Sequence, residues 1–368
     1  IRGGSYNIIF LDEFAFVPTN IAEMFFSSVY PTISSGQKTK MVIVSTPYGM
    51  NQFYKLWIDA EKKRNDYIPI EVHWSEVPGR DEEWKEQTIR NTSAEQFQQE
   101  FECEFLGSVN TLISPAKIKN ISFKTPKTSN AGLDVYEDPI KDRTYVCTVD
   151  VARGVLKDYS AFIVLDVTQM PFKVVAKYRN NDIKPLLFPH TIEKVAKAYN
   201  HAHVLVETND LGQQIAEALQ FELEYDNLLM TTNRGRAGQI LGAGFSGRGS
   251  GFGVKMTKQI KKIGCANIKT LIESDKIGIH DFDIVQEMST FVRRGQSWQA
   301  EEGNTDDLMM CLVIFGWLSN QPFFKEMTDT NARQMLYDEQ QALIEQDMAP
   351  FCFVDDGITE HEKVTVDE

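Results

Sequence analysis

The chain has 368 residues, 42% hydrophobic and 24% charged, which is the composition of a globular protein long enough for two domains. No apolar run reaches the roughly 18 residues of a membrane-spanning helix, so no membrane partner is expected. The five cysteines include no C-x-x-C pair, which argues against a disulfide framework or structural zinc and favours a reducing compartment. Because residues 1–5 lack an initiator Met and signal-peptide features, we expect an internal piece of a longer chain.

Charge is distributed unevenly along the sequence. The formal net charge is −14, and residues 326–368 contribute −10 of it, with twelve acidic against two basic side chains. Residues 228–272 carry eight Lys and Arg side chains and not one Asp or Glu. Polyanion binding depends on the local potential, so this basic segment keeps a nucleic-acid partner open despite the acidic total.

The N-terminal third alternates between short apolar runs and helical patterns. Apolar runs at residues 8–11 and 41–44 end in polar residues, as buried parallel strands do. Apolar residues at helical spacing predict helices over residues 51–64 and 84–105, and residues 93–96 of the second resemble a capping box. Alternating strands and helices predict an α/β sheet.

A second α/β unit follows a polar segment, residues 107–142, that we interpret as the interdomain connection. Strands are predicted at 144–151, 161–167, 172–178, 203–206 and 228–231, and helices at 191–199, 213–223, 257–274 and 306–318. Three opening strands followed by strand–helix alternation is the order of an RNase H-like sheet. The predicted domains are therefore residues 1–106 and 143–325, with an acidic tail at 326–368.

The first strand ends in Asp12 and Glu13, which is the pattern of a Walker B motif. In that motif the aspartate holds Mg²⁺ beside the phosphates of ATP, and the glutamate orients the attacking water. The same residues also fit an alternative interpretation, in which a strand simply ends in two acids that face solvent. The second strand, however, ends at Ser45 and Thr46, where P-loop motors place a residue that senses the γ-phosphate. The pair favours the C-terminal part of a P-loop ATPase domain.

A phosphate-binding loop of the form G-x-x-x-x-G-K-[ST] is missing from the sequence. Without it, no backbone cradle or Lys holds the phosphates. This chain as given is therefore not expected to hydrolyse ATP.

Acidic residues stand at the ends of predicted elements in the second unit. Asp150 and Glu207 each end an apolar strand, and Asp306 and Asp307 open an apolar helix. Buried acids are costly unless they are paired or bind metal. Acids on adjacent elements could hold two divalent ions about 3.5–4 Å apart, which activate a water and stabilise the leaving oxygen of a phosphodiester. Carboxylates select Mg²⁺ or Mn²⁺ over zinc.

Each of these acids also has a structural interpretation. Asp306 fits a helix N-cap with Asp307 in the first turn. Glu207 fits a salt-bridge partner, and Asp150 fits a turn. Asp158 is a further candidate ligand, for which a hairpin turn fits equally. The ordered set is more specific than any member, and it favours a metal site.

The basic segment combines Lys and Arg with glycines. Glycines let a backbone approach phosphate closely, and the cations supply sequence-independent attraction to DNA. A mobile loop followed by a helix with a solvated basic face is the alternative. The candidate DNA-binding residues are Arg234, Arg236, Arg248, Lys255, Lys258, Lys261 and Lys262.

In this order the motifs resemble those of the large terminase subunit of tailed bacteriophages, most closely the contractile-tailed (myovirus) type. The matching stretches are FLDEFAF at 10–16, VSTPYGMNQFY at 44–54, VDVARG at 149–154, LVETN at 205–209 and TDDLMM at 305–310. The resemblance implies an ATPase that pumps DNA into the prohead through the portal, joined to an RNase H-like nuclease that cuts the concatemer. It departs from the family in lacking the phosphate loop.

The resemblance also implies roles for single residues. Asp12 would be the Walker B metal acid, Glu13 the catalytic carboxylate, and Ser45 and Thr46 part of the coupling motif. The nuclease metal triad would be Asp150, Glu207 and Asp307, with Asp307 ranked ahead of Asp306. Implied partners are double-stranded DNA, the portal protein and the small terminase subunit, in the host bacterial cytoplasm and transiently at the portal vertex. ATP and Mg²⁺ would serve the full-length parent.

Two further hypotheses remain. In one, the chain is a fragment of a DNA-gripping motor or helicase whose RNase H-like domain does not cleave. In the other, it is a docking module whose acidic tail binds the portal or another packaging protein.

Overall fold

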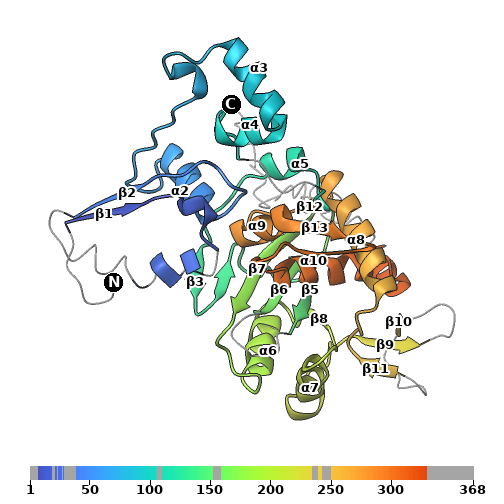
Figure 1. Ribbon diagram of the computed structural model, residues 1–368. Helices are drawn as coiled ribbons and strands as arrows, with labels where there is room; N and C mark the ends of the chain where they lie inside the picture. Colours follow the sequence, from blue (N-terminus) through green and yellow to red (C-terminus); the bar gives the residue numbers. More distant parts are fainter. Residues whose placement is uncertain are drawn as a thin grey trace, which may run out of the picture.

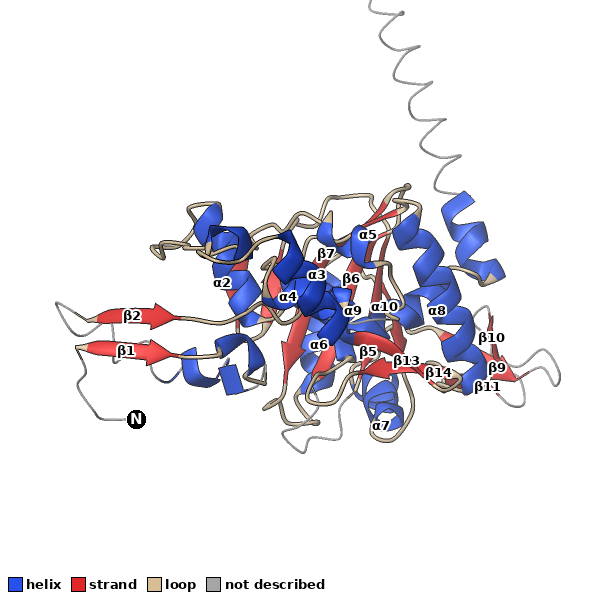
Figure 2. Ribbon diagram, turned by 45° about the horizontal axis from the view of Figure 1, so that its top comes forward, coloured by secondary structure: helices blue, strands red, loops and turns tan. Residues whose placement is uncertain are grey.

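The computed structural model describes residues 7–18, 21, 22, 24–26, 28, 39–105, 110–151, 159–233, 239–242 and 250–329 (Figure 1). In Figures 1 and 2 the strands β1 and β2 lie at one end of the molecule, and β9 to β11 lie at the other. The acidic tail from residue 330 onward falls outside the described residues, as do Arg234, Arg236, Arg248 and Asp158. In the described part, no helix is long and apolar enough to cross a membrane.

The N-terminal part is built on a parallel strand pair, β1 (Ile8–Leu11) and β2 (Lys40–Ile43). A short 3-10 helix, η1 (Phe14–Phe16), follows β1, and α2 (Gln52–Glu61) follows β2. Asn51 begins α2, and its side chain accepts hydrogen bonds from the amides of Phe53 and Tyr54, which would otherwise lack helical partners. These elements agree with the predicted strand–helix alternation.

The helix predicted over residues 84–105 is instead two helices, and that prediction was wrong. After η2 (Trp74–Glu76), the chain forms α3 (Glu82–Asn91) and α4 (Ala94–Glu100). Thr92 leaves helical geometry, with φ −125° and ψ −110°, and Oγ of Ser93 accepts a hydrogen bond from the amide of Gln96. The capping pattern thus starts a new helix rather than reinforcing a continuous one.

A seven-stranded sheet forms the centre of the second unit. The strands β5 (Tyr145–Asp150), β6 (Ser160–Asp166) and β7 (Phe172–Asn180) are consecutive antiparallel neighbours, and β8 (His203–Val206) returns parallel to β5, as the RNase H-like interpretation requires. The strands run β3-β4-β7-β6-β5-β8, and β12 pairs with one end of β7. Because β4 pairs with β7, residues from the proposed connection extend this sheet. The strands are β3 (Thr128–Asn130), β4 (Leu133–Val135), β5 (Tyr145–Asp150), β6 (Ser160–Asp166), β7 (Phe172–Asn180), β8 (His203–Val206) and β12 (Ile277–Gly278).

Helices cover both faces of this sheet, because alternate side chains of its strands point to opposite sides. Cys147 and Val149 pack against α6 and α7, while Val146 packs against α8, α9 and α10. On the first face lie α6 (Phe188–Ala198), α7 (Gly212–Glu217) and the π-helical turn η3 (Ala218–Glu222); on the second lie α8 (Lys258–Glu273), α9 (Phe282–Thr290) and α10 (Asp307–Leu318). All twelve residues of α10 are buried, which explains its unbroken apolar sequence.

Smaller elements complete the fold. A short helix, α5 (Pro115–Lys119), contacts α9, and the hairpin β13 (Phe291–Arg294) and β14 (Ser297–Ala300) follows α9 directly. The strand predicted at 228–231 starts two residues later and joins a separate sheet of β9 (Met230–Asn233), β10 (Gln239–Gly242) and β11 (Ser250–Phe252).

Candidate metal centre and family

Asp150 and Glu207 lie side by side where two parallel strands end. Val149 of β5 is in register with Val206 of β8, and the amide of Glu207 donates a hydrogen bond of 2.9 Å to the carbonyl of Val149. Because parallel strands end at the same edge of a sheet, the two acids emerge together at that edge. Glu207 is 9% exposed, and Asp150 is half-buried.

Helix α10 brings Asp306 and Asp307 to the same place. The helix is tied to the sheet by Thr148, whose hydroxyl donates a hydrogen bond of 2.9 Å to the carbonyl of Cys311. Asp307 is 9% exposed at the first position of the helix. Asp306 occupies the N-cap position, but its side chain makes no capping hydrogen bond to the described residues of α10 and instead accepts one from the amide of Ala300.

The acids influence one another strongly. Burial raises the pKa of Asp150 well above its usual range, and the carboxylates of Glu207, Asp307 and Asp306 raise it further. Burial also raises the pKa of Glu207 to about 7, although Lys261 acts in the opposite direction. Like charges packed this closely favour the protonated forms unless a cation joins them. The four acids therefore influence one another electrostatically at the end of β5 and β8 and the start of α10.

The donor set suits a divalent cation. Oε1 of Glu207 accepts a hydrogen bond of 2.9 Å from Asn209, whereas Oε2 is buried and has no hydrogen-bond partner among the described residues. A buried carboxylate oxygen without a partner is costly, and a metal ion would satisfy it. All four candidate ligands are carboxylates, the hard oxygen donors that Mg²⁺ and Mn²⁺ prefer.

Two glycines let the chain fold closely around Glu207. A Cβ on Gly212, at the start of α7, would lie 1.8 Å from the carbonyl oxygen of Glu207. A Cβ on Gly253 would lie 2.3 Å from the carbonyl oxygen of Val206, and Gly253 has φ +70°. Part of the basic segment thus returns beside β8, where Val254 bridges to Glu207.

Lys261 is the described DNA-binding candidate whose charge acts on Glu207. It is half-buried on α8, and its Nζ lies 5.5 Å from the ring centroid of Phe291. Lys255, Lys258 and Lys262 are exposed. Lys269, further along the same helix, is exposed as well, so the described part of the basic segment includes one half-buried lysine that acts on the acids and four lysines on the surface.

Sequence reasoning missed a fifth acid, Glu287 of α9. It is 3% exposed, and burial raises its pKa to about 8, with Arg179 lowering it and Asp307 raising it. Oε2 of Glu287 accepts a hydrogen bond of 2.8 Å from the amide of Met309 in the first turn of α10. An acid in an amphipathic helix normally faces solvent, so its sequence position carried no signal.

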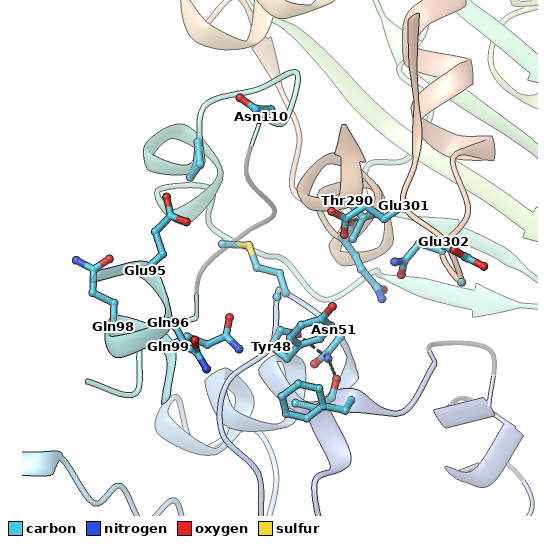
Figure 3. Close-up of a pocket in the computed structure, with 18 of the residues that line it drawn as sticks. Tyr48, Asn51, Glu95, Gln96, Gln98, Gln99, Asn110, Thr290, Glu301 and Glu302 are labelled. Atoms are coloured by element: carbon cyan, nitrogen blue, oxygen red, sulfur yellow. Dashed lines mark hydrogen bonds between the residues drawn. The ribbon is translucent and has the colours of Figure 1, made fainter. Parts of the chain in front are cut away.

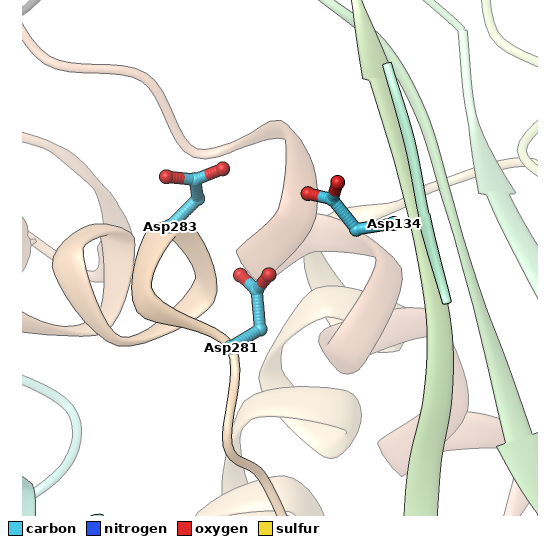
Figure 4. A group of neighbouring side chains, drawn as sticks. All are labelled: Asp134, Asp281 and Asp283. Atoms are coloured by element: carbon cyan, nitrogen blue, oxygen red, sulfur yellow. The ribbon is translucent and has the colours of Figure 1, made fainter. Parts of the chain in front are cut away.

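A second acidic cluster lies away from this centre. Figure 4 shows Asp134, Asp281 and Asp283 pointing toward one another, close enough to bind one cation. The ammonium of Lys177, which is 3% exposed, already pairs with all three, at 2.8 Å from Asp134 and 3.2 Å from Asp281. We interpret this cluster as a buried ion-pair network, because a cation of the protein itself occupies it.

The N-terminal candidates also meet. Asp12 and Glu13 are exposed after β1, and Glu13 adopts a left-handed conformation with φ 50°. The hydroxyl of Ser45 lies 3.4 Å from Oε2 of Glu13 and accepts a hydrogen bond from the amide of Ala15. Thr46 is adjacent and half-buried. The two motifs are thus in contact across the ends of β1 and β2.

A cleft of about 1130 Å³ separates this N-terminal part from the second unit (Figure 3). Tyr48 and Asn51 line one wall, the polar face of α4 lines another, and Thr290, Glu301 and Glu302 approach from the β13–β14 side. The segment that follows Ser45 and Thr46 therefore opens onto a cavity shared with the second unit.

Comparison with known proteins matches two parts of the chain to two domain families. The family described as terminase large subunit, T4likevirus-type, N-terminal, matches residues 1–120, and the terminase RNaseH-like domain family matches residues 147–321. The large terminase subunit of Thermus virus P23-45 is 25% identical over 234 residues, which cover 60% of this chain and 46% of that protein. That of Thermus phage G20c is 24% identical over the same length.

Solved structures give a weaker likeness. The large terminase nuclease from phage G20c with bound magnesium has 19% identity and a TM-score of 0.44, and covers 57% of this chain and 97% of that one. The large terminase of the HK97 bacteriophage has 10% identity and a TM-score of 0.36, covering 86% of this chain and 71% of that one. This chain spans about half the length of the curated relatives it matches. With its two halves matched by the two domain families of one protein, the chain belongs to the family of phage large terminase subunits.

Proposed function

We propose that this chain acts in viral DNA packaging and that its RNase H-like domain is a metal-dependent endonuclease that cuts concatemeric double-stranded DNA. The observation that carries the proposal is the placement of Asp150 and Glu207 at neighbouring strand ends, under the electrostatic influence of Asp306 and Asp307, with a buried oxygen of Glu207 that has no partner among the described residues. Such a cluster is unstable as a set of anions, and it suits a reaction that needs divalent cations beside a phosphate.

In this proposal Asp150, Glu207 and Asp307 hold Mg²⁺ or Mn²⁺, with Asp306 as the neighbouring alternative ligand. The ions would supply the activated water and the charge that stabilises the leaving oxygen. The protein's own residues orient the site: Asn209 fixes one oxygen of Glu207, and α10 fixes Asp307 against the sheet. Lys261 adds positive charge where a phosphate would approach the acids.

DNA binding in this proposal follows α8 and the basic segment before it. Lys255, Lys258 and Lys262 are exposed, and they would bind the phosphate backbone, a contact that gives no strong sequence preference. Arg234, Arg236 and Arg248 are proposed to share this role.

For the N-terminal part, we propose the second half of a packaging ATPase. Asp12 would bind the metal of Mg²⁺–ATP and Glu13 would orient water, with Ser45 and Thr46 coupling nucleotide state to movement. For a terminase of full length we likewise propose ATP binding, the portal protein and the small terminase subunit as partners, and a location in the host cytoplasm and at the portal vertex.

The test is cleavage of supercoiled plasmid with Mn²⁺, Mg²⁺ or EDTA by the wild type, Asp150→Ala and Asp182→Ala. Asp182 is an exposed acid after β7 and serves as the matched control. The proposal predicts metal-dependent cutting that Asp150→Ala loses and Asp182→Ala keeps. Retained DNA binding with no cutting by the wild type would favour the non-cleaving, DNA-gripping alternative.

A further inference from the structure

Glu287 contacts the chain on both sides of the two aspartates that begin α10. Its Oε1 accepts a hydrogen bond of 3.1 Å from the hydroxyl of Thr305, immediately before Asp306. Its Oε2 accepts one of 2.8 Å from the amide of Met309, in the first turn after Asp307. One buried carboxylate therefore holds the segment that presents both aspartates.

Arg179 of β7 completes this arrangement from the sheet. Its Nη2 donates a hydrogen bond of 2.9 Å to the hydroxyl of Thr305, and its Nε lies 3.7 Å from Oε1 of Glu287. The guanidinium group is 3.9 Å from the ring centroid of Tyr159, which directly precedes β6, and the two groups form a cation–π contact. The hydroxyl of Thr305 thus accepts from Arg179 and donates to Glu287, which links the sheet to the helix.

This network replaces an ordinary helix cap. The first amides of a helix lack helical partners and usually receive them from the side chain at the N-cap. Asp306 occupies that position, yet its carboxylate accepts from Ala300, while the carboxylate from α9 accepts from Met309. A carboxylate at this end of α10 is also favoured by the helix dipole. Because Glu287 of α9 accepts the hydrogen bond from Met309, the carboxylate of Asp306 is not needed as the cap of α10.

We infer that Glu287, held by Arg179 and Thr305, is a positioning residue that fixes the start of α10 and thereby sets Asp307 against Asp150 and Glu207. Both oxygens of Glu287 accept hydrogen bonds from the segment that begins α10, so it acts through that helix. The inference rests on the proposed function, since it assigns the support for the same metal centre.

The test measures Mn²⁺ binding to the purified chain by calorimetry without DNA, and amide exchange at residues 308–310 by mass spectrometry. Glu287→Ala should weaken Mn²⁺ binding about 10- to 100-fold, the usual effect of removing a group that orients metal ligands. It should also speed exchange at these amides. Glu287→Gln, which keeps an acceptor oxygen for Met309, should recover part of the affinity.

Met288→Ala is the matched control, because Met288 lies on the same helix, is fully buried and belongs to the core. It should lower the melting temperature and leave Mn²⁺ affinity within about twofold of the wild type. Should Glu287→Ala fail to fold, Thr305→Val removes the linking hydroxyl alone and should weaken binding in the same direction.

Wild-type affinity in folded Glu287→Ala, or an equal loss in Met288→Ala, would overturn the inference. Asp150→Ala separates this result from the proposed function. If Asp150→Ala loses Mn²⁺ binding and Glu287→Ala does not, the metal centre stands and the positioning role fails. If Asp150→Ala binds Mn²⁺ like the wild type, the proposed centre itself is wrong.

Discussion

Gly212 packs directly against the backbone carbonyl of Glu207, at a separation that leaves no room for a side chain. A Cβ at this position would lie 1.8 Å from the carbonyl oxygen, and the obstacle is backbone, which cannot rotate away. The first turn of α7 and the end of β8 therefore depend on this glycine for their approach, and the placement of Glu207 depends on it too.

Gly212→Ala should consequently displace Glu207 and destabilise the fold by about 1–3 kcal/mol, the usual cost of overpacking. Gly251→Ala is the matched control, since a Cβ there meets nothing within 4 Å. Urea unfolding in EDTA and the rise in melting temperature on adding Mn²⁺ would measure both effects. Equal stability and equal Mn²⁺ response in the two variants would show that this close approach is unimportant.

Stability without divalent ions should depend on pH through Glu207, whose pKa burial raises to about 7. In the unfolded chain a Glu titrates near about 4.3, so between about pH 4 and 7 the folded state holds more protons than the unfolded state. The free energy of unfolding should therefore fall as pH rises through this window. In EDTA, the melting temperature of Glu207→Gln should therefore fall by a few degrees less than that of the wild type over the same pH range. Parallel curves for the two proteins would contradict the burial of this acid.

Lys261 should matter for the rate of cleavage and Lys262 for binding alone. Lys261 is half-buried beside Glu207, whereas Lys262 is exposed on the same helix. Lys261→Ala should slow single-turnover cleavage at saturating DNA on the order of 100-fold, as removal of a charge-stabilising donor does. Lys262→Ala should keep this rate. It should make the plot of log binding constant against log salt concentration less steep, by the amount that corresponds to about one phosphate contact. A rate unchanged in Lys261→Ala would remove that lysine from the site.

Asn51 should stabilise the contact between the two N-terminal motifs. Its side chain begins α2 and also donates hydrogen bonds to the carbonyls of Ala15 and Tyr48. Asn51→Ala should cost about 1–2 kcal/mol as a lost cap and speed amide exchange at residues 14–17. Ser93→Ala, which removes the cap of α4, should cost a similar amount without affecting those amides. Identical exchange patterns would argue against a special link to Ala15.

The strands and their terminal acids could be predicted because a buried strand is recognisable as a short run of apolar residues in the local sequence. The apolar runs that end at Asp150 and Glu207 could be identified from the local sequence alone. The parallel pairing of β5 and β8 then places the ends of the two runs side by side. Glu287 and Lys177 could not be found this way. Each is a charged residue whose burial is satisfied by partners far along the chain, such as Met309 for Glu287 and Asp283 for Lys177. Such pairs become visible only after folding.

The division of the helix over residues 84–105 shows a different limit. Apolar spacing continued across Thr92 and Ser93, but the side chain of Ser93 bonds the amide of Gln96 and starts α4 afresh. A capping pattern within a run of apolar residues at helical spacing can therefore start a new helix even though the spacing continues. The same local competition is absent at Asn51, where cap and period begin together.

The central claim is that Asp150, Glu207 and Asp307 form a divalent-metal centre. Anomalous diffraction from crystals soaked in Mn²⁺ tests it most directly, because it locates the ions independently of activity. One or two peaks are expected between these three carboxylates, about 3.5–4 Å apart if there are two. Crystals with no peak beside Glu207, even if a peak replaces Lys177 between Asp134, Asp281 and Asp283, would contradict the proposed centre.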